Sequence, residues 1–95
     1  MSESIISRKK VCYICNSMNG IEEHHIFFGK NRRNSEKDGL KVYLCNYHHR
    51  GHSGVHGRDG HKLDVMLKSI AEESWLKHYD KTTDDFIKRY GKNYL

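Results

Sequence analysis

The chain has 95 residues, and its 17 lysines and arginines exceed its 12 aspartates and glutamates, giving a formal net charge of +5 with neutral histidines. This length predicts a single domain over residues 1–95, and an apolar content of only 36% predicts a thin core. No apolar run approaches the roughly 20 residues needed to cross a bilayer, and the first ten residues lack the apolar stretch of a signal peptide. We therefore expect a cytoplasmic protein with reduced thiols and no membrane partner.

Short apolar segments alternate with polar ones in the first part of the chain. The first ten residues are polar and basic and predict a frayed arm. Strands are predicted over three segments, at residues 11–15, 21–28 and 40–44. The polar stretch 30–39 predicts a loop, and residues 46–57, which are rich in histidine and glycine, predict a short helix followed by an irregular turn.

The C-terminal region, residues 62–91, has the pattern of two helices. Apolar residues recur at helical spacing from Leu63 to Ile70 and continue beyond it, which predicts a helix over residues 62–79. Thr82 offers an N-cap with acidic residues in the first turn after it, and Gly91 offers a C-cap for a second helix. We expect both helices to pack on the preceding half of the chain. Docking of a protein partner on their apolar stripe is the alternative.

Three cysteines and one histidine have the spacing of metal ligands. Cys12 and Cys15 form a C-x-x-C pair, and Cys45 and His48 form a C-x-x-H pair. Four ligands of these types are what a closed tetrahedral zinc site requires, and each pair places two donors on one tight turn. The alternatives are two unrelated surface motifs or a redox C-x-x-C, although no βαβ pattern surrounds the first pair. Zinc binding would supply folding energy that the thin core lacks.

Histidine is concentrated in one stretch, with seven of the eight histidines between residues 24 and 61. On a strand, His24 and His25 point to opposite faces and should have different tasks. On a helix, His49 projects about 100° away from His48 and so faces a second site. This geometry indicates one structural metal and one catalytic metal.

The sequence resembles the HNH, or ββα-metal, nuclease family. The likeness rests on Glu23-His24-His25-Ile26, a hairpin loop, and Leu44-Cys45-x-x-His48-His49 followed by a later histidine. It resembles the zinc-braced variant of the family and also the short phage- and prophage-borne members, and the likeness covers residues 11–57. The resemblance implies an α+β fold, in which a small zinc-stabilised ββα-metal core carries the two C-terminal helices. It also implies a phage or bacterial host context.

The same resemblance implies the roles of individual histidines. His25 corresponds to the general base, and His24 and His49 correspond to ligands of the catalytic metal. His56 or His52 would supply the third ligand, and we prefer His56 because Gly54 and Gly57 suit a chain that bends back toward the site. An imidazole shell suits Zn²⁺, Ni²⁺, Co²⁺ or Mn²⁺ better than Mg²⁺, although Mg²⁺ stays among the candidates.

One family feature is missing. The family usually has an asparagine a few residues before the Leu-Cys pair, where it holds the general base in its reactive tautomer, and this chain has Gly39-Leu40 there. Asn31, Asn34 or a backbone carbonyl would have to take over this task.

Positive charge near the histidines predicts the class of substrate. Basic residues neighbour the histidines in the sequence: Lys30, Arg32, Arg33, Arg50 and Arg58. They would contact the backbone of a polyanion, which predicts cleavage of DNA with low sequence specificity, with RNA as an open alternative. Two other functions stay open: an inactive zinc-stabilised module that binds nucleic acid, and a structural zinc protein that binds a protein partner.

Overall fold

The computed structural model describes residues 3–51, 54–58 and 60–95. Its sheet is a single antiparallel hairpin of β1 (Ile21–His25) and β2 (Lys41–Cys45), paired in a register that sets Ile21 opposite Cys45 and His25 opposite Lys41. Because side chains alternate along a strand, His25, Glu23 and Lys41 share one face of the hairpin and His24 lies on the other.

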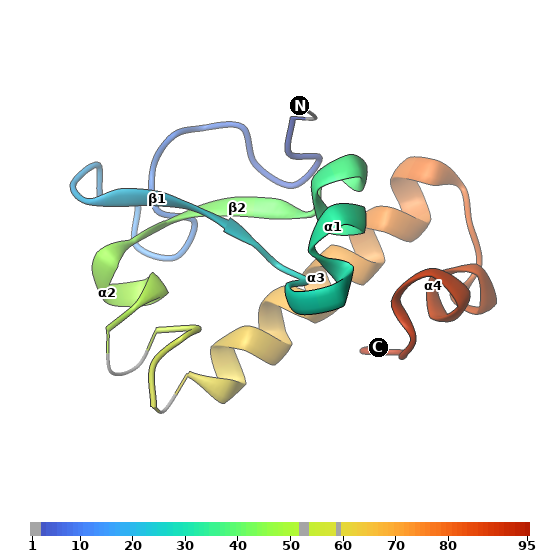
Figure 1. The fold of residues 1–95 in the computed structure, drawn as a ribbon. Helices are drawn as coiled ribbons and strands as arrows, with labels where there is room; N and C mark the ends of the chain where they lie inside the picture. Colours follow the sequence, from blue (N-terminus) through green and yellow to red (C-terminus); the bar gives the residue numbers. More distant parts are fainter. Residues whose placement is uncertain (1–2, 52–53, 59) are drawn as a thin grey trace.

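Helices connect and flank this hairpin (Figure 1). The connection between the strands contains the short 3₁₀ turn η1 (Gly29–Asn31) and α1 (Arg32–Asp38). One helical turn, α2 (Asn46–His49), follows β2 directly, and the long helix α3 (His61–Tyr79) and α4 (Thr83–Tyr90) complete the chain. The elements make an α+β architecture, with α2 at one end of the hairpin and α4 beyond the other end (Figure 1).

The core lies between the hairpin and α3 and continues to α4. Val42 and Leu44 point from one face of β2, and Leu67, Ala71 and Trp75 line the buried side of α3. The α4 end is aromatic, because Phe27, Phe86 and Tyr90 pack ring against ring at centroid separations of 4.5 to 5.7 Å. Helix α3 therefore packs on the hairpin, and α4 packs on Phe27, just after β1, and on α3, so both C-terminal helices pack on the preceding half of the chain as their apolar spacing predicts.

A buried carboxylate joins α1 to both C-terminal helices. Asp38 accepts hydrogen bonds from Trp75 Nε1 at 2.9 Å, from the Tyr90 hydroxyl at 2.7 Å and from the Arg89 guanidinium at 2.6 and 2.9 Å. The Tyr79 hydroxyl donates to the Asp38 carbonyl at 2.9 Å. We call these five residues the Asp38 network. It neutralises a buried charge and satisfies its oxygens, as burial of a carboxylate requires.

The prediction of a loop over residues 30–39 is wrong for most of that segment, which forms α1. No apolar residue marks this helix, since its sequence is RRNSEKD. It is held by polar contacts: the buried Ser35 hydroxyl donates to the Leu40 carbonyl at 2.5 Å and accepts from the Phe27 N–H. Gly39 then ends the helix with a φ of +73°, a conformation that costs glycine little.

Other predicted boundaries change less. Residues 11–15 form a turn rather than a strand, and β1 ends at His25 instead of residue 28. The predicted helices are confirmed as α3 and α4. Thr82 and Asp85 form the capping box of α4, and Gly91 has the left-handed conformation of a C-cap.

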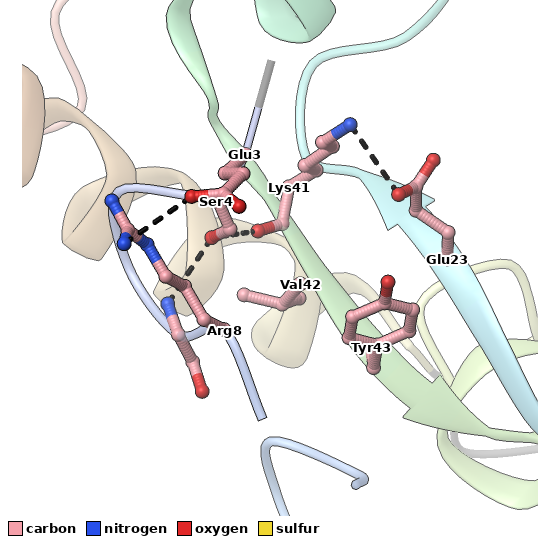
Figure 2. A pocket seen from close by; sticks show the side chains of 8 residues that line it. Glu3, Ser4, Arg8, Glu23, Lys41, Val42 and Tyr43 are labelled. Atoms are coloured by element: carbon pink, nitrogen blue, oxygen red, sulfur yellow. Dashed lines mark hydrogen bonds and ion pairs between the residues drawn. The ribbon is translucent and has the colours of Figure 1, made fainter. Parts of the chain in front are cut away.

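The N-terminal segment is not a frayed arm where the structure describes it. The Ser4 hydroxyl donates to the Lys41 carbonyl at 2.5 Å, and the Ile5 N–H donates to the Gly39 carbonyl at 3.0 Å. Figure 2 shows the pocket of about 260 Å³ that this segment encloses against β2, with the Lys41 side chain reaching toward Glu23. Within the described residues, no helix has the length and apolar character needed to span a membrane.

Candidate metal centres

Cys12, Cys15, Cys45 and His48 converge at the α2 end of the hairpin, and we call them the cysteine cluster. Their ligand atoms all lie within 4.8 Å of one another. The Cys15 and Cys45 sulfurs are 3.8 Å apart, and His48 Nδ1 lies 3.3 Å from Cys45 Sγ and 3.6 Å from Cys12 Sγ. Around a tetrahedral zinc, two sulfurs lie about 3.8 Å apart, and a sulfur and a nitrogen lie about 3.5 Å apart. The donor set therefore has the types and the spacing that zinc requires.

The turn that follows Cys12 positions two of the four side chains of the cysteine cluster. The Asn16 N–H donates to the Cys12 carbonyl at 2.8 Å, and Asn16 has a φ of +62°, so residues 12–16 form one tight turn that carries both cysteines. Although burial raises the pKa of the Cys12 thiol, backbone hydrogen bonds at Cys45, Cys15 and Ile14 outweigh this and lower it to about 6. The thiolate is the form that binds metal, so these backbone hydrogen bonds favour the ligand state of Cys12.

A second group, His24, His49 and His56, forms the histidine cluster. Its ligand atoms also lie within 4.8 Å of one another. The ring centroids are 5.1 Å apart for His24 and His49, 5.1 Å for His24 and His56, and 4.8 Å for His49 and His56. Imidazoles that share one ion through nitrogens at about 2.0 Å have ring centres roughly 4.5–5.2 Å apart. The three rings are thus spaced as ligands of one ion would be.

His24 supplies an independent observation in favour of a metal site. It is 2% exposed, and its Nε2 is buried without a hydrogen-bond partner among the described residues. Burial, with the charges of His49 and His56, lowers the pKa of His24 to about 3. The ring is therefore neutral near pH 7 and keeps a lone pair for a cation. An ion at the centre of the cluster would give His24 Nε2 a partner.

His49 is oriented by a residue that the sequence analysis did not single out. Its Nδ1 lies 2.8 Å from Glu22 Oε1, and because a carboxylate only accepts, Nδ1 must carry the proton. That tautomer leaves Nε2 free for a metal, as in the carboxylate–histidine–metal arrangement. Arg50 Nε donates to the same carboxylate oxygen at 3.0 Å.

His56 is brought to the cluster by backbone hydrogen bonds to α2. The Val55 N–H donates to the His48 carbonyl, and the His56 N–H donates to the His49 carbonyl, each at 2.9 Å. Gly54 allows this approach, since a Cβ there would lie only 2.7 Å from the His48 backbone. The preference for His56 as the third histidine agrees with this placement, while His52 lies outside the described residues.

His25 lies on the opposite face of the hairpin from the histidine cluster, in a charged group of its own. Its Nε2 is 2.7 Å from Glu36 Oε1, so Nε2 carries the proton and Nδ1 is left unprotonated in the neutral ring. Lys41 is only 4% exposed, and its Nζ lies 2.9 Å from Glu36 and 3.3 Å from Glu23. Burial lowers the pKa of this amine, but hydrogen bonding to Glu36 and the charge of Glu23 outweigh it and raise the pKa.

Glu36 therefore holds His25 in one tautomer, a task for which the sequence suggested Asn31 or Asn34. Those asparagines contact α4 instead, since Asn31 Nδ2 donates to the Tyr90 carbonyl and Asn34 Nδ2 to the Arg89 carbonyl. Glu23, His25 and Glu36 also have ligand atoms within 4.8 Å of one another. We assign no metal to them, because Lys41 already pairs with both carboxylates.

The five basic residues singled out in the sequence are all exposed: Lys30, Arg32, Arg33, Arg50 and Arg58. A sixth basic residue, Lys68, was missed because it lies on α3, outside the segment with metal-ligand spacing. Lys68 pairs with Asp64 at 2.9 Å, and its Nζ lies 4.6 Å from the centre of the Phe28 ring, beside the histidine cluster.

Comparison of the chain with protein-family models, with curated proteins and with solved structures finds no match in any of the three. The cysteine cluster could bind a metal such as zinc, and this conclusion rests on its donor atoms alone.

Proposed function

We propose that the protein is a metal-dependent endonuclease of the HNH type, which hydrolyses phosphodiester bonds in DNA with low sequence specificity. The observation that carries the proposal is the convergence of His24, His49 and His56, beside a separate cysteine cluster reached through the same helical turn. Two ion sites with different donors favour two tasks, since a site closed by three thiolates suits structure and an imidazole site leaves room for substrate. In this proposal β1, β2 and α2 belong to a ββα-metal core.

Each histidine has a separate task in the proposed reaction. His24, His49 and His56 would hold a divalent cation, which would polarise the scissile phosphate and stabilise the departing oxygen. His24 and His25 point to opposite faces but are the last two residues of β1, so the scissile phosphate would have to lie across the end of this strand. There His25 would accept a proton from water on Nδ1 while the water oxygen attacks phosphorus and the bond to the leaving oxygen breaks. The leaving oxygen then takes a proton from solvent. Glu36, hydrogen-bonded to Nε2, would keep Nδ1 free and stabilise the charged ring after proton transfer.

Positive charge supports a nucleic acid as the substrate. Lys30, Arg32 and Arg33 are exposed on the segment that follows β1, a few residues beyond His24 and His25. Such residues neutralise backbone phosphates without reading bases, which is the reason for proposing low specificity. RNA has the same backbone charge and is the first alternative substrate to assay.

Plasmid nicking tests the proposal. The zinc-loaded protein is incubated with supercoiled plasmid and with Mg²⁺, Mn²⁺, Ni²⁺ or further Zn²⁺, and relaxed circles are quantified. We expect nicking with at least one metal, and a loss of about 10²–10⁴-fold in His25→Ala, the usual contribution of a general base. His78→Ala is the matched control, because His78 is exposed on α3 away from all three histidine-containing groups.

Metal counting separates this proposal from its rivals. We expect His25→Ala to bind as many metal ions as the wild type, and His49→Ala to lose one of them. Salt-sensitive DNA binding without nicking under any metal would favour an inactive binding module. Two bound ions without DNA binding would favour a structural protein, and either result would overturn the nuclease proposal.

A further inference from the structure

Phe28 is an exposed aromatic residue at the border of the histidine cluster. It follows the buried pair Ile26 and Phe27, yet its own side chain turns outward and the residue is 43% exposed. Its ring centroid lies 5.4 Å from that of His56 and 6.2 Å from that of His24. An exposed apolar residue needs no explanation when it stands alone, but this one touches two of the three histidines that we assign to the metal.

The ring is held in place before any ligand arrives. Lys68 Nζ lies over it at 4.6 Å from the centroid, and Lys68 is fixed in turn by its ion pair with Asp64. The two imidazoles meet the ring at interplanar angles of 50° and 64°, so neither stacks on it face to face. Because Lys68 occupies one face, a flat ligand can stack only on the opposite face. A ring that is already ordered loses little entropy when such a ligand binds.

Charge near Phe28 indicates the kind of flat ligand. Phe28 directly precedes η1, and the exposed Lys30 and Arg32 follow within four residues. A nucleic acid strand combines what these groups recognise, because its phosphates are anionic and each of its bases has an aromatic face. A base in intact duplex is already stacked on its neighbours, whereas an unpaired base is free to stack on a side chain.

We propose that Phe28 is a stacking platform for an unpaired nucleobase next to the scissile phosphate, and that the protein prefers single-stranded or locally unpaired DNA. This inference rests on the proposed nuclease function and adds a substrate class to it. Lys68 supports the platform from behind, and the histidine cluster at the ring's border places the stacked base beside the phosphate to be cut.

Binding is tested with a short oligodeoxynucleotide that contains 2-aminopurine, used single-stranded and annealed to its complement. The protein is zinc-loaded His25→Ala, so that the probe is not cut, and anisotropy gives affinity while 2-aminopurine fluorescence reports stacking. We expect tighter binding of the single strand and quenched fluorescence. Adding Phe28→Leu should weaken single-strand binding by about 5- to 100-fold, as expected for loss of one stacked base.

Two matched variants isolate the effect of the ring. Phe28→Trp keeps an aromatic face and should retain the affinity and the quenching. Ile87→Ala removes an apolar side chain of similar exposure, 38%, from α4 and should change neither. Unchanged affinity in Phe28→Leu, equal binding of single strand and duplex, or unquenched fluorescence in the complex would overturn the platform. If wild-type nicking persists in those cases, only this inference fails; absence of both binding and nicking would end the proposed function itself.

Discussion

The α2 end and the α4 end of the molecule are built from different interactions. Around α2, seven cysteine and histidine side chains form the two candidate metal centres, the cysteine and histidine clusters, and the backbone beside α2 consists of turns. Around α4, packed aromatic rings and the Asp38 network hold the helices without any metal ligand. We therefore expect this small chain, with its low apolar content, to be stabilised at one end by burial and at the other by metal coordination.

We expect the largest loss of stability from removing one cysteine of the cysteine cluster. Cys45→Ser takes a thiolate from the cysteine cluster, and structural zinc contributes about 10–16 kcal/mol of apparent binding energy that folding depends on. We expect loss of zinc and unfolding, measured by metal content and far-ultraviolet circular dichroism. Met18→Ala, in the neighbouring turn and 78% exposed, should change neither. A folded Cys45→Ser protein would show that coordination does not hold this end.

The opposite end is tested at Asp38. Asp38→Ala leaves the Arg89 charge and the Trp75 and Tyr90 donors without their acceptor, which should lower the free energy of unfolding by about 3–5 kcal/mol. Urea denaturation of the zinc-loaded protein measures the loss. Asp84→Ala, an exposed change on α4, should cost only about 0.5 kcal/mol. A similar small cost for Asp38→Ala would mean that ring packing alone holds α4.

The smallest effect is a dependence on pH at the histidine cluster. Burial lowers the pKa of His24 to about 3, whereas the unfolded chain has an ordinary histidine pKa, so the unfolded state binds more protons between these values. Stability of protein loaded with one zinc equivalent should therefore fall as the pH drops below about 6.5. His24→Gln should remove about 1 kcal/mol of the loss between pH 7 and pH 5.5.

The difference in stability is measured from the urea midpoints of the wild type and of His24→Gln between pH 7 and pH 5.5. Release of the structural zinc in acid affects both proteins equally, so the difference isolates His24. Parallel pH profiles would contradict a neutral buried His24.

Elements with a regular signal could be predicted from the sequence. The apolar spacing from Leu63 onward predicts α3, because a helix that packs on a core must present one face to it. Thr82 and Gly91 predict the ends of α4, because caps satisfy backbone groups by local chemistry. The cysteine cluster was predictable for a similar reason, since two ligands three residues apart can meet at one ion.

The rest depends on contacts between distant residues of the same chain. Helix α1 has no apolar residue to predict it, and Asp38 is buried only because Trp75, Arg89 and Tyr90 come from the other end of the sequence. Glu22 and Glu36 look like ordinary surface residues in the sequence. Their tasks appear only when folding brings His49 and His25 to them.

The succession of His48 and His49 within α2 fixes the length of this turn. One residue inserted between them would rotate the second ring by about 100° and carry it out of its cluster, while the first stayed in place. Natural variants of this chain should therefore gain or lose residues in the turns on either side of α2, and keep these two neighbours together.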